Sequence, residues 1–181
     1  MENKKQKLYT IATSHLDTSW LWTLEKTIED YIPDTLKKNF DYLEKYPEYK
    51  MNFEGSYRYE LIKEYYPEEY EKLKKYIKDG RWNPCGSCYE NGDVNIPSPE
   101  ALTRNILYGN SFFKKEFGIT PYRYLCKRKT ELAKNMLKNT NLSVREIAFK
   151  LNYADEYYFS NVFKKEVGVS PSNYKKASID I

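Results

Sequence analysis

The first two thirds of the chain alternate short apolar runs with longer amphipathic stretches. Three apolar, β-prone runs predict strands, and each is followed by a helical pattern. The predicted strands span 8–12, 50–54 and 81–89, and the predicted helices span 19–46, 56–79 and 98–117. Pro67 breaks the second helical pattern, whereas Ser98 and Pro99 are typical of a helix start. Strands that alternate with helices predict parallel βαβ units, with ligand sites at the carboxyl ends of the strands.

The last third of the chain has a purely helical pattern. Apolar residues recur at helical spacing over 122–138, and a polar break follows at 139–141. Ser143 then caps a short helix that closes at Asn152, and 155–167 predicts a second helix. Two short helices joined by a tight turn on a basic segment are typical of a helix-turn-helix, although a plain helical hairpin has the same spacing. We therefore expect an α/β fragment followed by an all-α helix-turn-helix unit.

One 13-residue segment occurs twice in the chain. Residues 112–124 (FFKKEFGITPYRY) and 162–174 (VFKKEVGVSPSNY) are identical at seven of 13 positions. Each copy combines a basic helix end, a Gly that stops the helix, and a Ser/Thr-Pro pair that opens the next one. Only the second copy is preceded by a complete helix-turn-helix pattern. The first copy is therefore a seam between two kinds of sequence.

Charge is divided unequally along the chain. Residues 1–119 carry 18 Lys+Arg and 20 Asp+Glu, a net charge of −2, and residues 120–181 carry 12 and 6, a net charge of +6. The two sum to the +4 of the whole chain. A basic surplus confined to the C-terminal third predicts a polyanionic partner for that part, and double-stranded DNA is such a partner.

Cysteine usage and hydropathy indicate the compartment. The three Cys are an odd number, which argues against a disulfide scaffold and favours a reducing cytoplasm. Cys85 and Cys88 form a CxxC pair without a second one, so structural thiols are favoured over a redox or zinc role. The start of the chain lacks the apolar run of a signal peptide, and no segment approaches the roughly 18 apolar residues of a membrane helix. We expect a soluble cytoplasmic protein with no membrane partner.

His15 and Asp17 follow the first predicted strand. Because they are two residues apart in an extended segment, their side chains project from the same face. An imidazole nitrogen and a carboxylate oxygen could then bind one Zn²⁺. A polar strand end with no metal explains the same pattern.

Two longer passages resemble the N-terminal part of glycoside hydrolase family 38 α-mannosidases. They are HLDTSWLWT at 15–23 and KDGRWNPCGSCYENGDVNIPSPEALTRNILYGNSFF at 78–113, and the resemblance covers 1–119. It implies a partial β/α barrel with parallel strands, zinc ligands at His15 and Asp17, and a sugar subsite lined by Trp20. Mannosides are the substrates of that family.

The resemblance also implies that the catalytic site is incomplete. A zinc site needs about three or four ligands, and a retaining glycosidase needs two carboxylates about 5 Å apart. His15 is the only His in the chain, and the resemblance implies that the nucleophile, the acid and the second zinc His lie beyond the matching part. We therefore assign no catalytic residue and expect an inactive α-mannosidase-like fragment in which zinc is at most partly ligated.

The segment LSVREIAFKLNYADEYYFSNVFKKEVGVSPSNYKK at 142–176 resembles the DNA-binding domain of AraC/XylS transcription regulators. The resemblance covers 120–176 and implies a linker helix at 122–138 and a recognition helix at 155–167. The base-facing residues it implies are Glu156, Tyr157, Ser160 and Asn161. The phosphate-facing residues it implies are Arg145, Lys164 and Lys165, and basic side chains of the linker region, Arg123, Lys127, Arg128 and Lys129, are expected to add to them.

This second resemblance is partial as well. The DNA-binding domain of the family has two helix-turn-helix units, and only the tail of the first, FFKKEFGIT, occurs here. We therefore expect a chimera, with a truncated mannosidase-like domain at 1–119 joined through FKKEFGI to an AraC-type domain at 120–181. The predicted function is sequence-specific DNA binding in transcription regulation, and the alternative is a fragment of mannose metabolism.

Overall fold

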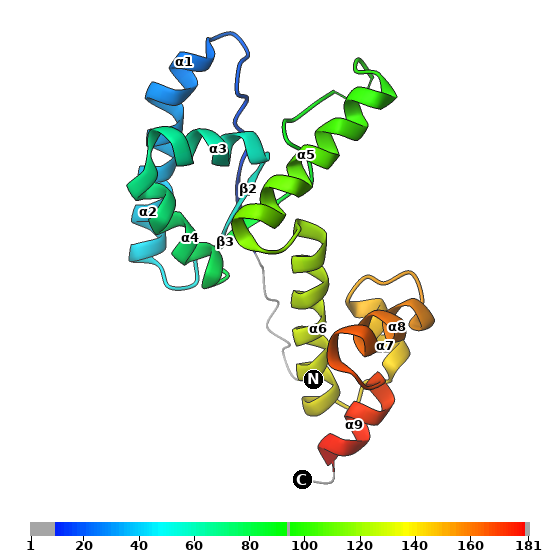
Figure 1. Cartoon of the computed structure of the whole chain (residues 1–181). Coiled ribbons are helices and arrows are strands. Elements are labelled where there is room, and N and C mark those ends of the chain that lie inside the picture. The colour runs from blue at the N-terminus through cyan, green and yellow to red at the C-terminus, as the bar shows by residue number, and fades with distance from the viewer. Residues whose placement is uncertain (1–9, 94, 180–181) are drawn as a thin grey trace, which may run out of the picture. The chain divides into compact units, whose positions relative to one another are not determined.

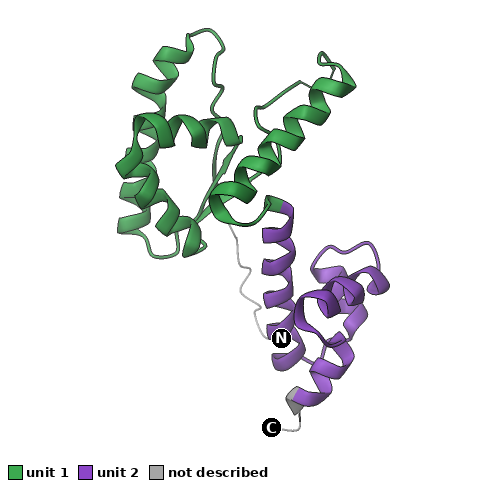
Figure 2. Ribbon diagram, in the orientation of Figure 1, with its two compact units in different colours: residues 1–121 green, residues 122–181 purple. Residues whose placement is uncertain are grey.

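The computed structural model describes residues 10–93 and 95–179. It divides into two compact units, 1–121 and 122–181 (Figure 2). The first unit contains a parallel sheet with helices, and the second is entirely helical (Figure 1). This confirms the predicted fold class of an α/β fragment followed by a helix-turn-helix unit. None of the described helices combines the length and apolar character needed to cross a membrane.

The sheet of the first unit has three short parallel strands in the order β1-β2-β3. They are β1 (Ala12–Ser14), β2 (Met51–Glu54) and β3 (Trp82–Cys85). Ala12 pairs with Met51 and Met51 pairs with Trp82, so the three strands start at the same level. Because all three run in the same direction, their carboxyl ends meet at one edge of the sheet, as the alternating pattern predicted.

Helices connect and cover these strands. They are α1 (Leu24–Lys26), a π-helix (Thr27–Tyr31), α2 (Ile32–Lys45), α3 (Ser56–Tyr65), α4 (Pro67–Lys78) and α5 (Pro99–Phe117). Pro67 opens α4, so the break predicted from this proline is present. Ser98 accepts a hydrogen bond from the backbone N–H of Ala101 at 3.1 Å, as its predicted role at the start of α5 requires.

Three predicted boundaries were wrong. The first helical segment begins at Leu24 and not at Ser19, because the Ser19 hydroxyl donates to the carbonyl of Trp22 at 3.0 Å and holds a bend there. The third strand stops at Cys85 and not at residue 89, because Gly86 adopts a left-handed φ of 74°. The first strand lies at 12–14, whereas its predicted residues 8 and 9 are outside the described part of the chain.

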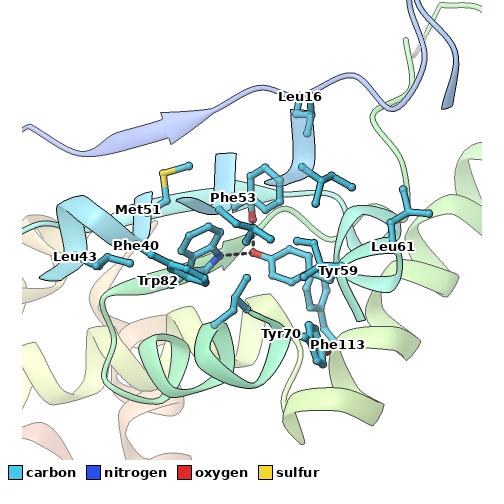
Figure 3. Close-up of a cluster of buried hydrophobic side chains, with 14 of the residues drawn as sticks. Leu16, Phe40, Leu43, Met51, Phe53, Tyr59, Leu61, Tyr70, Trp82 and Phe113 are labelled. Carbon is cyan, nitrogen blue, oxygen red and sulfur yellow. Dashed lines mark hydrogen bonds between the residues drawn. The ribbon is translucent and has the colours of Figure 1, made fainter. Parts of the chain in front are cut away.

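Aromatic and aliphatic side chains together form the core of the first unit (Figure 3). The buried Trp82 indole donates to the Tyr59 hydroxyl at 3.0 Å, and this hydroxyl donates to the Phe53 carbonyl at 2.9 Å. Burial raises the pKa of Tyr59 well above its ordinary value, which keeps the hydroxyl protonated as a donor. Phe113 of α5 packs edge-on against Tyr59 with 5.6 Å between ring centroids. The seam helix α5 is therefore part of the α/β core.

The second unit contains four helices in its described part. They are α6 (Pro121–Asn139), α7 (Val144–Lys150), α8 (Glu156–Val167) and α9 (Pro171–Ile179). Ser143 and Glu146 form a reciprocal capping box at the start of α7. Asn152 adopts a φ of 55° in the turn, and Asp155 accepts from the backbone N–H of Tyr158 at 2.7 Å to cap α8. Polar side chains thus define both helix starts of the helix-turn-helix.

The two copies of the repeat end their helices in the same way. Gly118 and Gly168 adopt φ values of 71° and 88° after α5 and α8. Their N–H groups donate to the carbonyls of Lys114 and Lys164 at 3.0 and 2.8 Å. The copies differ in their surroundings, since the first packs into the α/β core and the second into the helical core.

Candidate functional site

A polar cluster occupies the edge of the sheet where the strands end. The imidazole of His15 lies between two carboxylates, with Nδ1 2.9 Å from Glu54 Oε1 and Nε2 3.3 Å from Asp17 Oδ1. The His15 side chain is 64% exposed. The hydrogen bond to Glu54 is the main cause of a raised His15 pKa, and Asp17 adds to it. The ion pairs are therefore complete below the ordinary His pKa and weaken as the pH rises through the raised value.

His15 and Asp17 are the two zinc ligands that the resemblance implies. His15 and Asp17 do lie within reach of each other, as their spacing predicted. Across residues 10–93 and 95–179, however, no three His, Cys, Asp or Glu side chains are grouped so that they could hold a metal ion. Zinc binding through His15 and Asp17 therefore remains a prediction from the resemblance. Sequence reasoning missed Glu54, although its place at the end of a predicted strand was a usable signal.

Arg58 of α3 ties the strand ends together from inside the unit. Its side chain is fully buried, and Nη2 lies 2.8 Å from Glu90 Oε1. Nε donates to the carbonyl of Leu16, and Nη1 donates to the carbonyl of Glu54 at 3.4 Å. A Cβ on Gly55 would lie only 1.9 Å from Nη1, so the guanidinium requires glycine there. The Arg58 guanidinium thus connects three segments of the chain. They are the segment after β1, the end of β2 and the loop after β3.

Glu90 is fixed from the other side by Asn105 of α5. The Asn105 side chain accepts from the Glu90 N–H and donates to the Glu90 carbonyl, both at 2.8 Å. The second carboxylate oxygen of Glu90 accepts from the Thr18 hydroxyl. The loop that carries His15 and Asp17 is therefore anchored by contacts that are far apart in sequence, and these contacts were not predicted.

Three other residues that the sequence analysis singled out, Trp20, Cys85 and Cys88, also belong to this unit. The Trp20 ring is 70% exposed at the surface of the bend before α1, and its role at a sugar subsite stays a prediction. Cys85 and Cys88 are free thiols of intermediate exposure. Burial is the main cause of a raised Cys85 pKa, and nearby Glu54 raises it further. A raised thiol pKa lowers reactivity, which favours a structural role for Cys85.

Helix α8 presents one face to the core and the opposite face to solvent. Phe159 and Phe163 are fully buried. Tyr157, Asn161 and Lys164, spaced i, i+4 and i+7, lie on the exposed face. The Tyr157 side chain is 85% exposed. We call these three residues the outer stripe of α8.

Most of the other residues predicted to contact DNA are also exposed. Ser160 is half-buried, and Glu156 is exposed in the first turn of α8. Arg145 of α7 is exposed, as are Lys127, Arg128 and Lys165. Sequence reasoning did not single out Phe149 of α7, which is 84% exposed four residues after Arg145.

Two basic residues of α6 that were expected to contact phosphate also have contacts within the second unit. Arg123 Nη1 lies 3.1 Å from Glu166 Oε1. Lys129 Nζ donates to the carbonyl of Asn152 at 3.3 Å and lies 4.7 Å from the centroid of the Tyr153 ring. These contacts brace the turn and the end of α8 against α6. We therefore regard Arg123 and Lys129 as supports of the helix-turn-helix.

The fold and these two sites define a chain in which a parallel α/β unit precedes a helix-turn-helix unit. Residues 5–125 match the model of the Glycosyl hydrolases family 38 N-terminal domain, and the chain belongs to that family. Residues 108–177 match the model of a Helix-turn-helix domain. The two matches overlap at 108–125, which contains the first copy of the repeat. The chain is a chimera of the two, as the sequence indicated.

Relatives of both parts are much longer proteins. Alpha-mannosidase G of Dictyostelium discoideum is 36% identical over 112 residues, covering 62% of this chain and 10% of that protein. The raffinose operon transcriptional regulatory protein RafR of Pediococcus pentosaceus is 40% identical over 76 residues, covering 42% of this chain and 27% of that protein.

Among solved structures, the C-terminal domain of AraT, a response regulator from Geobacillus stearothermophilus, is 28% identical, with a TM-score of 0.39 over 59% of this chain and 83% of that one.

Proposed function

We propose that this chain binds double-stranded DNA through its second unit, as a partial AraC/XylS-type transcription regulator in the cytoplasm. The outer stripe of α8 carries the proposal, because it offers an aromatic, an amide and a cationic side chain on a helix whose other face is locked into a core. A helix of 12 residues is about 18 Å long and fits the major groove. The net charge of +6 over residues 120–181 supplies the attraction to phosphate.

Binding through one helix-turn-helix should be weak. The described second unit holds one such motif, and a single motif contacts one segment of the major groove. The phosphate contacts then dominate, so the affinity should approach the 10⁻⁴ to 10⁻⁶ M that is typical of non-specific association. Arg145 of α7 and Lys164 and Lys165 of α8 are exposed cations on the two helices of the motif, and we expect them to contact phosphate.

The test is a titration of fluorescent duplexes at 50 and 200 mM salt. We expect binding to weaken steeply with salt, and Lys164→Ala should weaken it for all duplexes alike, with the salt slope reduced by about 0.9. Lys74→Ala is the matched control, since Lys74 pairs with Glu71 on α4 of the first unit, and it should bind as the native chain does. Equal losses in the two variants, or binding that ignores salt, would overturn the proposal.

A second candidate function is mannoside hydrolysis, which is favoured by His15 and Asp17 at the strand ends of a family 38 domain. We propose that this chain alone does not carry it out. The chain spans about a tenth of the mannosidases that it matches, and it contains a single His. With added Zn²⁺, purified protein should show no turnover of an aryl α-mannoside. Turnover that disappears in His15→Ala would contradict this expectation.

A further inference from the structure

Two adjacent tyrosines of α8 have opposite roles. The Tyr158 hydroxyl lies 2.6 Å from the Tyr122 hydroxyl of α6. The centroid of the Tyr158 ring lies 6.0 Å from that of the Tyr153 ring. Tyr158 is therefore part of the packing between α6 and the helix-turn-helix. The Tyr157 side chain, by contrast, is 85% exposed in the first turn of α8. An aromatic ring so exposed at the start of a recognition helix has apolar area available for a ligand.

The geometry of the outer stripe sets what Tyr157 can reach. Asn161 is one turn further along the same face, about 6 Å away along the helix axis. Base pairs are stacked about 3.4 Å apart, so the two side chains face positions about two base pairs apart. Glu156, although exposed, is rotated about 100° from Tyr157 around the helix and lies off the stripe.

The chemistry of the two side chains matches A·T pairs. In the major groove an asparagine amide pairs with N6 and N7 of adenine, and apolar side chains contact the C5-methyl group of thymine. We propose that Asn161 reads an adenine and that Tyr157 reads a thymine methyl group about two base pairs away. This specificity rests on the proposed function, because it requires α8 to lie in the major groove. Lys164, the third residue of the stripe, is a point charge suited to phosphate and adds affinity without sequence preference.

The experiment first selects preferred duplexes from a randomised library with the full chain. Each thymine of the selected site is then replaced by uracil, which lacks only the methyl group, and each adenine by 7-deazaadenine, which lacks only the N7 acceptor. One uracil substitution should weaken native binding about fourfold, the equivalent of one buried methyl group. One 7-deazaadenine substitution should weaken it about fivefold, the equivalent of one hydrogen bond.

Variants assign each effect to its side chain. The Tyr157→Ala variant should bind thymine and uracil duplexes equally, and 7-deazaadenine should still weaken its binding. The Asn161→Ala variant should bind adenine and 7-deazaadenine duplexes equally, and uracil should still weaken its binding. Tyr158→Phe is the matched control and should keep both effects, because its ring still packs against Tyr153. If uracil or 7-deazaadenine is tolerated at every position, or if the effects persist in the variants, the readout is overturned. Salt-dependent binding with no selected sequence also overturns it while the proposed function stands, and no binding at all would overturn both.

Discussion

Phe163→Ala is expected to unfold the second unit, and with it to abolish DNA binding, while the first unit stays folded. Phe163 is fully buried, with its ring centroid 5.8 Å from that of Phe159 and 5.6 Å from that of Tyr174. Truncating a buried Phe to Ala costs about 3–5 kcal/mol. A unit of this size has a total stability of only about 3–9 kcal/mol. The variant should therefore lose most or all of its stability.

The tryptophans make this expectation measurable in the intact chain. All three, Trp20, Trp22 and Trp82, lie in the first unit, so tryptophan fluorescence reports that unit and circular dichroism reports helices in both. In Phe163→Ala, part of the helical circular dichroism signal should be lost at low denaturant concentration. The unfolding transition of the first unit, followed by tryptophan fluorescence, should not change. Phe149→Ala is the matched control, since the 84% exposed Phe149 should affect stability by no more than about 0.5 kcal/mol. Retained DNA binding in Phe163→Ala would contradict the assignment of binding to the second unit.

Arg58→Met is expected to have the complementary effect, destabilising the first unit and leaving DNA binding intact. The substitution keeps much of the apolar stem but removes the donors to Leu16, Glu54 and Glu90. Removing one partner of a buried ion pair costs about 3–5 kcal/mol, and the lower end applies because Glu90 remains 34% exposed. The denaturation midpoint from tryptophan fluorescence should fall accordingly.

A surface arginine provides the control for this variant. Arg104 forms an exposed ion pair with Glu100 one turn earlier in α5, so Arg104→Met should change stability by less than about 1 kcal/mol. If Arg58→Met is as stable as Arg104→Met, the buried guanidinium does not hold the strand ends. Loss of DNA binding in Arg58→Met would show that the second unit depends on the first.

The elements with strong local signals were predictable from sequence. Parallel strands followed from apolar runs that alternate with amphipathic stretches, and the starts of α5 and α7 followed from Ser98 and Ser143. The exposed position of Asn161 on α8 followed from helical periodicity, since Phe159 and Phe163 define the buried face. These features depend on residues within one or two helical turns of each other.

The contacts that sequence reasoning missed connect residues far apart in the chain. Arg58 and Glu90 are separated by 32 residues, and no local pattern indicates that an arginine on a helix will be fully buried. Lys129 belongs to a basic run that predicted phosphate contacts, yet it contacts Asn152 and Tyr153 in the turn. In both cases the fold provides a partner that outweighs the preference of a charged side chain for solvent.

The most direct test of DNA binding by the second unit is a two-dimensional NMR titration of the intact, ¹⁵N-labelled chain with a short duplex. We predict that amide shifts concentrate in 144–150 and 156–167, with the largest changes at Tyr157, Asn161 and Lys164. Amides near His15 and Glu54 should not move. Shifts around the strand ends with none in α8, or no saturable shifts anywhere, would contradict the account.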